Sequence, residues 1–166
     1  MTWAPMTPEV EKENSDAFWV WLMGLRNTAH ESGLTFAAYC YNASAENQYL
    51  RRFGKLTGIG DEVEQFIKSE EWVDLLAVWN SQLITGGSSA LKVVAPLVGF
   101  SWDVEDPGGG ESMLRYDAAV GDGDDVAEAR KWLLAYNRGD VEATLALREW
   151  LEVEGAEVPA VESPVF

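Results

Sequence analysis

The sequence has few of the side chains that most metal and thiol sites use. Its 166 residues include one histidine, His30, and one cysteine, Cys40. An internal disulfide is therefore excluded, and neither a zinc site nor a Cys-His pair is expected. The sequence also lacks a charged-then-apolar leader and any apolar run long enough to cross a bilayer. These absences predict a cytoplasmic protein without a membrane partner.

Basic residues are scarce as well. The chain has 12 lysine and arginine residues against 28 aspartate and glutamate residues, which gives a formal net charge of −16. Such a chain repels phosphate on average, so any polyanion would need a local site. Tryptophan, by contrast, is abundant, with eight residues. Helical spacing predicts core packing rather than ligand binding for Trp19, Trp79, Trp132 and Trp150.

The first part of the chain predicts a helix followed by a strand. Thr7 and Pro8 are a typical capping residue and first helical residue, so a helix is expected to run to about His30. The segment LTFAAYCY, residues 34–41, is uncharged and has the length of a strand. Its composition predicts a core strand that is buried on both faces.

The rest of the chain predicts mainly helices separated by turns. Its length and its 47% hydrophobic residues suit one domain, predicted over residues 1–155, with a flexible tail over residues 156–166. In order, we expect a helix after residues 42–47, a helix over 62–69 capped by Asp61, an apolar run over 72–79, a helix over 90–98 disturbed by Pro96, a loop over 101–110, a helix over 111–120, and helices over 126–134 and 140–153 joined around residues 137–139.

Three carboxylates stand beside apolar sequence, where a charge is costly unless it is paired, hydrogen-bonded or bound to a metal. They are Glu46, Asp74 and Asp140. Glu46 follows the predicted strand by about one helical turn, near the edge where open α/β sheets hold ligands. Alternatively, Glu46 is an acidic residue in the first turn of a helix, stabilised by the helix dipole. The alternative for Asp74 is a side chain that caps a neighbouring backbone amide.

Tyr136 and Asp140 are four residues apart and share a face if their helix is continuous. A phenol beside a metal-binding carboxylate could orient a water molecule. The alternative is that Asp140 caps the last helix and Tyr136 packs as an ordinary aromatic residue.

Five short segments, taken in order, form a recognisable pattern. They are YCYNASAE (39–46), VDL (73–75), SALK (89–92) with Gly99-Phe100, YNRGDVEAT (136–144) and LREWL (147–151). The pattern resembles the C-terminal RNase H-like domain of predicted RecB-family nucleases, which also occurs in YprB-type proteins. It covers about residues 9–153, and its most specific element is YNxxDxxAT followed by LRxWL.

The resemblance implies an α/β, RNase H-like fold that is rich in helices and has few strands. It also implies a metal-dependent 3′-to-5′ exonuclease of the DEDD type, which cleaves DNA or RNA phosphodiesters with two Mg²⁺ or Mn²⁺ ions. By position, Glu46 and Asp140 would be catalytic metal ligands, and Tyr136 would position the attacking water. Residues expected near the bound nucleic acid are Asn42, Arg51 and Arg138. The two arginines belong to a local basic rim that also includes Arg52, Lys55, Arg130 and Lys131.

One departure from the family pattern concerns its first motif, Asp-x-Glu on the opening strand. This sequence has Asp-x-Glu only at residues 103–105, too late in the order, and at residues 140–142. We therefore expect an N-terminally truncated nuclease domain, whose partner is the missing segment and which is inactive or nearly so in isolation. Exposed sheet edges or apolar surface would favour self-association.

Two other functions remain open at this point. A non-catalytic RNase H-like scaffold or protein-interaction module would suit the missing motif and the strong acidity. A helical interaction module without the nuclease fold would follow if residues 34–41 formed no strand.

Overall fold

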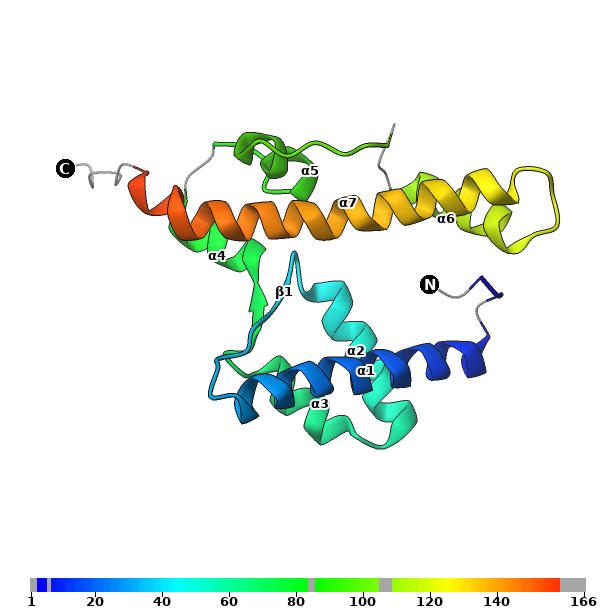
Figure 1. The fold of residues 1–166 in the computed structure, drawn as a ribbon, viewed down its shortest axis with the longest axis horizontal. Helices are drawn as coiled ribbons and strands as arrows, with labels where there is room; N and C mark the ends of the chain where they lie inside the picture. The colour runs from blue at the N-terminus through cyan, green and yellow to red at the C-terminus, as the bar shows by residue number, and fades with distance from the viewer. Residues whose placement is uncertain (1–2, 6, 84–85, 105–108, 159–166) are drawn as a thin grey trace.

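The computed structural model describes residues 3–5, 7–83, 86–104 and 109–158, and most of these residues are helical (Figure 1). The elements are α1 (Pro8–Glu31), β1 (Ala38–Cys40), α2 (Ser44–Thr57), α3 (Gly60–Ile67), β2 (Trp72–Asp74), α4 (Leu75–Gln82), α5 (Leu91–Val94), the 3₁₀ turn η1 (Ala95–Val98), α6 (Gly109–Val120), α7 (Val126–Val153) and the 3₁₀ turn η2 (Gly155–Glu157). Within this described part, no helix is long and apolar enough to span a membrane.

The first helix begins and ends where the sequence predicts. The Thr7 hydroxyl accepts a hydrogen bond from the Val10 amide at 3.3 Å, and Pro8 occupies the first turn. The helix ends at Glu31, and Gly33 follows with a φ of +70°, a conformation that glycine adopts without strain. The predicted helix start is therefore confirmed, together with the physical reason for it.

The two strands form a small parallel sheet in which Ala38 pairs with Trp72 and Cys40 with Asp74. The crossover between them contains α2 and α3. The predicted strand over residues 34–41 is wrong in extent and in burial, because only three residues are extended and Leu34 is 64% exposed. In the described chain β1 pairs with β2 alone, so its other edge has no strand partner, and the Arg148 guanidinium lies 5.1 Å from the centre of the Tyr39 ring. Still, a strand exists, which removes the condition for a purely helical module.

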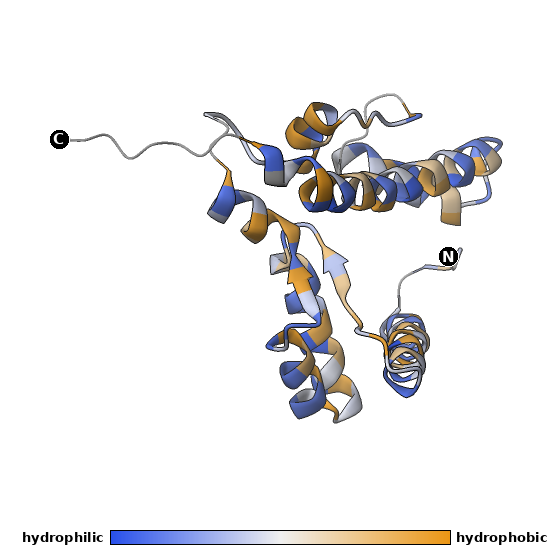
Figure 2. Cartoon of the chain, turned by 60° about the vertical axis from the view of Figure 1, so that its left-hand side comes forward, coloured by the Kyte–Doolittle hydropathy of each residue, from blue (hydrophilic) through white to orange (hydrophobic). Residues whose placement is uncertain are grey.

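The hydrophobic core is divided between two groups of helices. Helices α1–α3 lie on one side of the strand ends and α4–α7 on the other (Figure 1), and the two groups carry separate hydrophobic stretches (Figure 2). The first core contains Trp19, Leu22, Leu50, Phe53, Val63 and Phe66; the second contains Leu75, Trp79, Val94 and Leu147; a third, smaller one contains Ala119, Ala129 and Leu133. The prediction of core positions is confirmed for Trp19 and Trp79, while Trp132 and Trp150 are partly buried.

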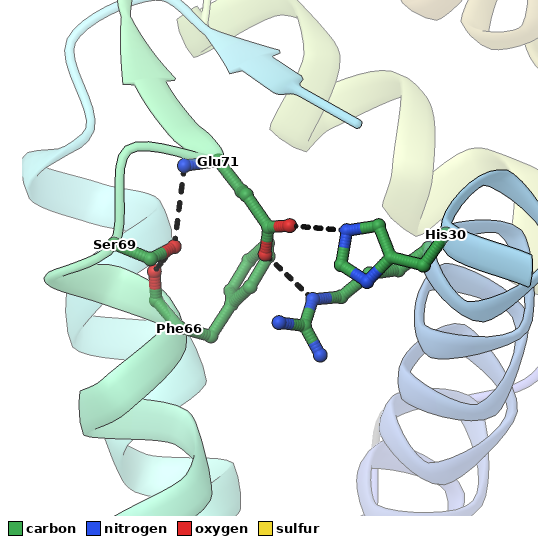
Figure 3. A network of polar contacts seen from close by, with 5 residues as sticks. His30, Phe66, Ser69 and Glu71 are labelled. Carbon is green, nitrogen blue, oxygen red and sulfur yellow. Dashed lines mark hydrogen bonds and ion pairs between the residues drawn. The ribbon is translucent and has the colours of Figure 1, made fainter. Parts of the chain in front are cut away.

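A polar network fastens the end of α1 to the start of β2 (Figure 3). The Glu71 carboxylate accepts a hydrogen bond from Arg26 Nε at 2.6 Å and lies 2.6 Å from His30 Nε2. The Glu71 amide in turn donates to the Ser69 hydroxyl at 3.3 Å. This network positions β2 relative to the first core, since Glu71 directly precedes the strand.

The predicted break between two C-terminal helices is wrong, because α7 runs without interruption through residues 137–139. Gly139 is buried inside this helix, where a Cβ atom would lie 2.4 Å from Trp102 Cδ1. The glycine thus lets the Trp102 indole pack directly on the helix backbone. Asp140 consequently lies within α7 and does not cap it, so that alternative is also wrong.

Smaller differences concern caps and boundaries. Asp61 lies in the first turn of α3 and makes no capping hydrogen bond, contrary to prediction. The helix disturbed by Pro96 does change type, from α5 to η1. Part of the predicted loop, residues 105–108, and the predicted tail from residue 159 onward lie outside the described residues.

Candidate functional site

The carboxyl ends of both parallel strands meet at one edge of the sheet and point toward α7 (Figure 1). Asp74, the last residue of β2, organises this edge. Its Oδ1 accepts hydrogen bonds from the amides of Asn42 at 2.9 Å and Leu76 at 3.0 Å, and its Oδ2 accepts one from the Ala43 amide at 3.0 Å. The capping interpretation of Asp74 is therefore confirmed: the side chain caps α4 and also holds the turn that leads into α2.

Asn42 forms that turn with a left-handed backbone, at a φ of 62°. Asparagine tolerates this conformation better than most residues. The backbone amide of Asn42 donates a hydrogen bond to Asp74, and the Asn42 side chain is exposed at the strand edge. The structure thus gives the backbone of Asn42 a structural role, and nucleic-acid contact by its side chain stays a prediction.

Glu46 lies in the first turn of α2, exposed to solvent. Its negative charge acts on the buried thiol of Cys40, the last residue of β1, so Glu46 lies close to the end of that strand. The pKa of Cys40 is raised to about 12, first by burial and then by the charges of Asp74 and Glu46. Both interpretations of Glu46 are compatible with this place, since a carboxylate in the first turn also interacts favourably with the helix dipole.

Asp140 and Tyr136 converge on one face of α7, as their spacing predicts. Trp102 Nε1 donates a hydrogen bond to Asp140 Oδ1 at 3.0 Å, and the Tyr136 hydroxyl bonds to the same carboxylate. The pKa of Tyr136 is raised to about 12, first by burial and then by the Asp140 charge and this hydrogen bond. The phenol therefore stays protonated at neutral pH and acts as a donor to Asp140.

A column of rings and cations holds the Tyr136 ring in place. Trp132 stacks on it with a centroid distance of 5.1 Å and an interplanar angle of 17°. Lys92 Nζ lies 5.1 Å from the Tyr136 centroid, and the Arg115 guanidinium lies 5.5 Å from the Trp132 ring. Sequence reasoning missed this column and Trp102. The position of Lys92 in SALK and the four-residue step from Trp132 to Tyr136 were the only signals for the column.

The basic residues differ in whether a carboxylate already neutralises them. Arg51 bonds to Glu64 through its Nε at 2.5 Å. Arg138 is exposed, and no carboxylate in the described chain pairs with it. Together with Arg130 and Lys131 it lines a hollow of about 730 Å³ on the outer side of α7. Of the two arginines predicted to contact nucleic acid, Arg138 is the one without a carboxylate partner in the described chain.

Metal ligation is the least supported part of the site. Across the residues that the structure describes, no group of three or more Asp, Glu, His or Cys side chains is close enough to hold a metal ion. Asp74 already accepts three backbone hydrogen bonds, and Asp140 is bonded to Trp102 and Tyr136. By themselves, these residues do not fit a two-metal centre, and ligation by Glu46 and Asp140 stays a prediction.

Comparison with known proteins gives a family but no individual relative. Neither a curated protein nor a solved structure matches the chain. A family model described as RNase_H superfamily matches residues 8–152, which is most of the chain and includes every predicted site residue. The match confirms the RNase H-like domain that the five sequence segments predict. The chain belongs to the RNase H superfamily.

Proposed function

We propose that this chain is the nuclease domain of a RecB-family or YprB-type protein and acts as a DEDD-type 3′-to-5′ exonuclease on DNA or RNA. Membership of the superfamily supports a nuclease-like or nucleic-acid-related function. The observation that carries the finer proposal is the Tyr136–Asp140 pair, bonded on one face of α7 and braced by Trp102.

In this proposal each residue of the pair has a separate task. Asp140 is held in one orientation by two donors, so its position does not depend on the ligand. Tyr136 keeps its proton near neutral pH and donates a hydrogen bond to Asp140, which leaves the lone pairs of the phenol oxygen free to accept a hydrogen bond from water. Tyr136 would thereby orient a water molecule for attack on a phosphodiester placed beside Asp140.

Mg²⁺ or Mn²⁺ belongs to the proposal because carboxylate oxygens are the ligands that such hard cations prefer. Glu46 and Asp140 would contribute two of these oxygens, and the other ligands would come from outside the described residues. When bound, the ions would neutralise charge on the attacking and leaving oxygens.

Nucleic-acid binding beyond the Tyr136–Asp140 pair is assigned to the hollow along α7, which neither residue of the pair lines. Seven of the twelve basic residues lie within 4.0 Å of a carboxylate in the described chain. Among the five others are Arg130, Lys131 and Arg138, all of which line this hollow, and Asp124 is the one acidic residue among the described residues that line it. A phosphate backbone gains most from cations that no carboxylate neutralises.

The test uses single-stranded DNA and RNA labelled at the 5′ end, with Mg²⁺ or Mn²⁺ added. Binding by the wild-type chain is expected, with slow shortening from the 3′ end. Asp140→Asn should abolish shortening without weakening binding, because it keeps the shape of the side chain. Glu142→Gln is the matched control, since Glu142 is exposed two residues further along α7. Shortening that survives Asp140→Asn, or a wild-type chain that does not bind, would contradict the proposal.

The binding surface is tested separately by the double variant Lys131→Glu with Arg138→Glu. Affinity should fall, and the salt dependence of log K for a single strand should flatten by about 1.4 as two phosphate contacts are lost. Lys12→Glu with Lys68→Glu changes the net charge equally at two cations that carboxylates already neutralise, and it should have a much smaller effect. Equal losses in the two double variants would show a general charge effect and not a local site.

A non-catalytic scaffold is the second candidate. It is favoured by the lack of a three-ligand group among the described residues and by the use of Asp74 as a cap. Binding without any shortening under either ion, in wild type and Asp140→Asn alike, would support it.

A further inference from the structure

Lys92 is a cation beside the Tyr136–Asp140 pair that no carboxylate of the described chain neutralises. Its Nζ lies 5.1 Å from the centre of the Tyr136 ring, and the hydroxyl of that ring bonds to Asp140. Lys92 is exposed, and none of the ion pairs among the described residues includes it. The chain has 28 acidic residues, yet this cation contacts the face of an aromatic ring.

The ring contact leaves the ammonium of Lys92 able to bind an anion. A lysine ammonium has three hydrogen-bond donors and no acceptor. The face of the Tyr136 ring attracts the positive charge, but it is a much weaker partner for these donors than an ionised oxygen. Because Lys92 is exposed, its other donors are accessible from solvent. An anion can therefore bind to Lys92 without displacing it from the ring.

The segment that carries Lys92 is fastened on both sides. Before it, the Tyr41 hydroxyl donates a hydrogen bond to the Ser89 carbonyl, and the Ser89 hydroxyl donates one to Asn80 at 2.6 Å. After it, Val94 is fully buried in the second core. The fold thus sets the position of Lys92 relative to both the strand edge and α7. A cation on a packed support loses less freedom on binding than one on a loop.

We propose that Lys92 binds a non-bridging oxygen of the phosphodiester nearest the 3′ end of a single strand, the linkage that the Tyr136–Asp140 pair would cleave. This inference rests on the proposed function and adds a substrate-binding residue to it. The donors bonded to Asp140 are neutral, so its negative charge repels a phosphate that approaches it. The positive charge of Lys92 offsets this repulsion at the place where the phosphate must lie.

The hollow along α7 cannot supply this contact. Its lining includes Arg130, Lys131 and Arg138 but neither Lys92 nor the Tyr136–Asp140 pair. The cations of the hollow would therefore hold other phosphates of the same strand, and Lys92 alone would sense the charge of the last linkage.

The experiment compares two short single-stranded DNAs that differ at one linkage. In the first, every linkage is a phosphodiester; in the second, the linkage nearest the 3′ end is an uncharged methylphosphonate. Fluorescence anisotropy of a 5′ label measures binding in EDTA, which removes the ions that cleavage would need. Wild type should bind the fully charged strand about threefold to tenfold more tightly. In Lys92→Gln this preference should be largely lost.

Two further variants separate a phosphate contact from other effects. Lys92→Arg keeps the positive charge and should keep most of the preference. Lys131→Gln is the matched control: it removes an unpaired cation of the hollow, so it should weaken both strands equally and leave the preference unchanged. If Lys92 only braced the Tyr136 ring, Lys92→Gln would likewise weaken both strands equally. That result, or a preference that Lys92→Gln leaves at the wild-type value, would overturn the inference.

Failure of this inference and failure of the proposed function give different results. A preference that depends on Lys92, in a chain that shortens no strand with Mg²⁺ or Mn²⁺, would support the phosphate contact and contradict the nuclease. Shortening by a chain whose preference does not depend on Lys92 would support the nuclease and contradict the contact. A wild-type chain that binds neither strand would overturn both.

Discussion

The helices before β2 and those after it use their charged side chains in different ways. In the first group, cations pair with carboxylates of neighbouring elements: Arg52 with Glu11 at 2.6 Å, and Arg51 with Glu64 at 2.5 Å. These pairs lie around an aromatic core in which Trp19 meets Phe66 edge-on at 5.7 Å. Most cations of this region are therefore already paired with a carboxylate within the molecule.

In the second group, the charged residues of the proposed site have either neutral hydrogen-bond donors or no ion-pair partner in the described chain. The carboxylate of Asp140 is bonded to the neutral donors Trp102 and Tyr136, and Lys131 and Arg138 have no carboxylate partner in the described chain. The negative charge of Asp140 and the positive charges of Lys131 and Arg138 are therefore available to a ligand. The comparison teaches that the first group mainly supplies packing and contributes Glu46 to the proposed site, whereas the second supplies Tyr136, Asp140 and the cations without a carboxylate partner.

The largest effect is expected from Phe53→Ala, which attacks the first core. Phe53 is 3% exposed and contacts Trp19 at a centroid distance of 6.2 Å. Removing a buried phenylalanine typically costs about 3–5 kcal/mol, which urea unfolding would measure. Leu56→Ala on the same helix is the control, because Leu56 is 53% exposed and should cost less than about 0.5 kcal/mol. An equal loss of hydrogen-exchange protection in α7 would contradict the separation of the two cores.

A smaller effect is expected from a pair of glycine variants, one in each region. In Gly139→Ala the new methyl group would collide with Trp102, displace the indole from Asp140 and destabilise the fold by about 1–3 kcal/mol. Gly24→Ala meets open space and should stabilise α1 by up to about 1 kcal/mol. Thermal unfolding of both variants at low micromolar concentration measures the difference. Equal shifts in melting temperature would show that Trp102 does not pack tightly on α7.

Local chemistry explains which parts of the fold were predictable. The start of α1 depends on Thr7 and Pro8, which act within one turn, so the sequence alone indicates it. The convergence of Tyr136 and Asp140 was predictable for the same reason, because residues four apart share a helix face. Each of these features is determined by neighbours in the sequence.

The parts that were not predictable depend on contacts between distant segments. Residues 137–139 look like a turn until Trp102 is placed against Gly139, which explains the glycine inside a continuous helix. The length of β1 depends on how far β2 runs beside it, and no pattern in residues 34–41 reports that. Trp102 itself lies in a segment without periodicity, so nothing in the sequence assigned it to Asp140.

The smallest effect concerns the Glu71 network, which joins the first core to β2 (Figure 3). The hydrogen bond from Arg26, with further contributions from His30 and both positive charges, lowers the pKa of Glu71 from 4.5. A carboxyl whose folded pKa lies below its unfolded value stabilises the fold above about pH 4.5, and that stabilisation is lost as the pH falls through the folded pKa. Glu71→Gln should therefore lower the unfolding free energy at pH 7 by less than about 1 kcal/mol, since the pair is partly exposed, and the difference from wild type should shrink below pH 4. Urea unfolding at pH 7 and at pH 3.5 measures the difference in unfolding free energy between Glu71→Gln and wild type. If this difference is the same at both pH values, the charge of Glu71 does not hold β2 against α1.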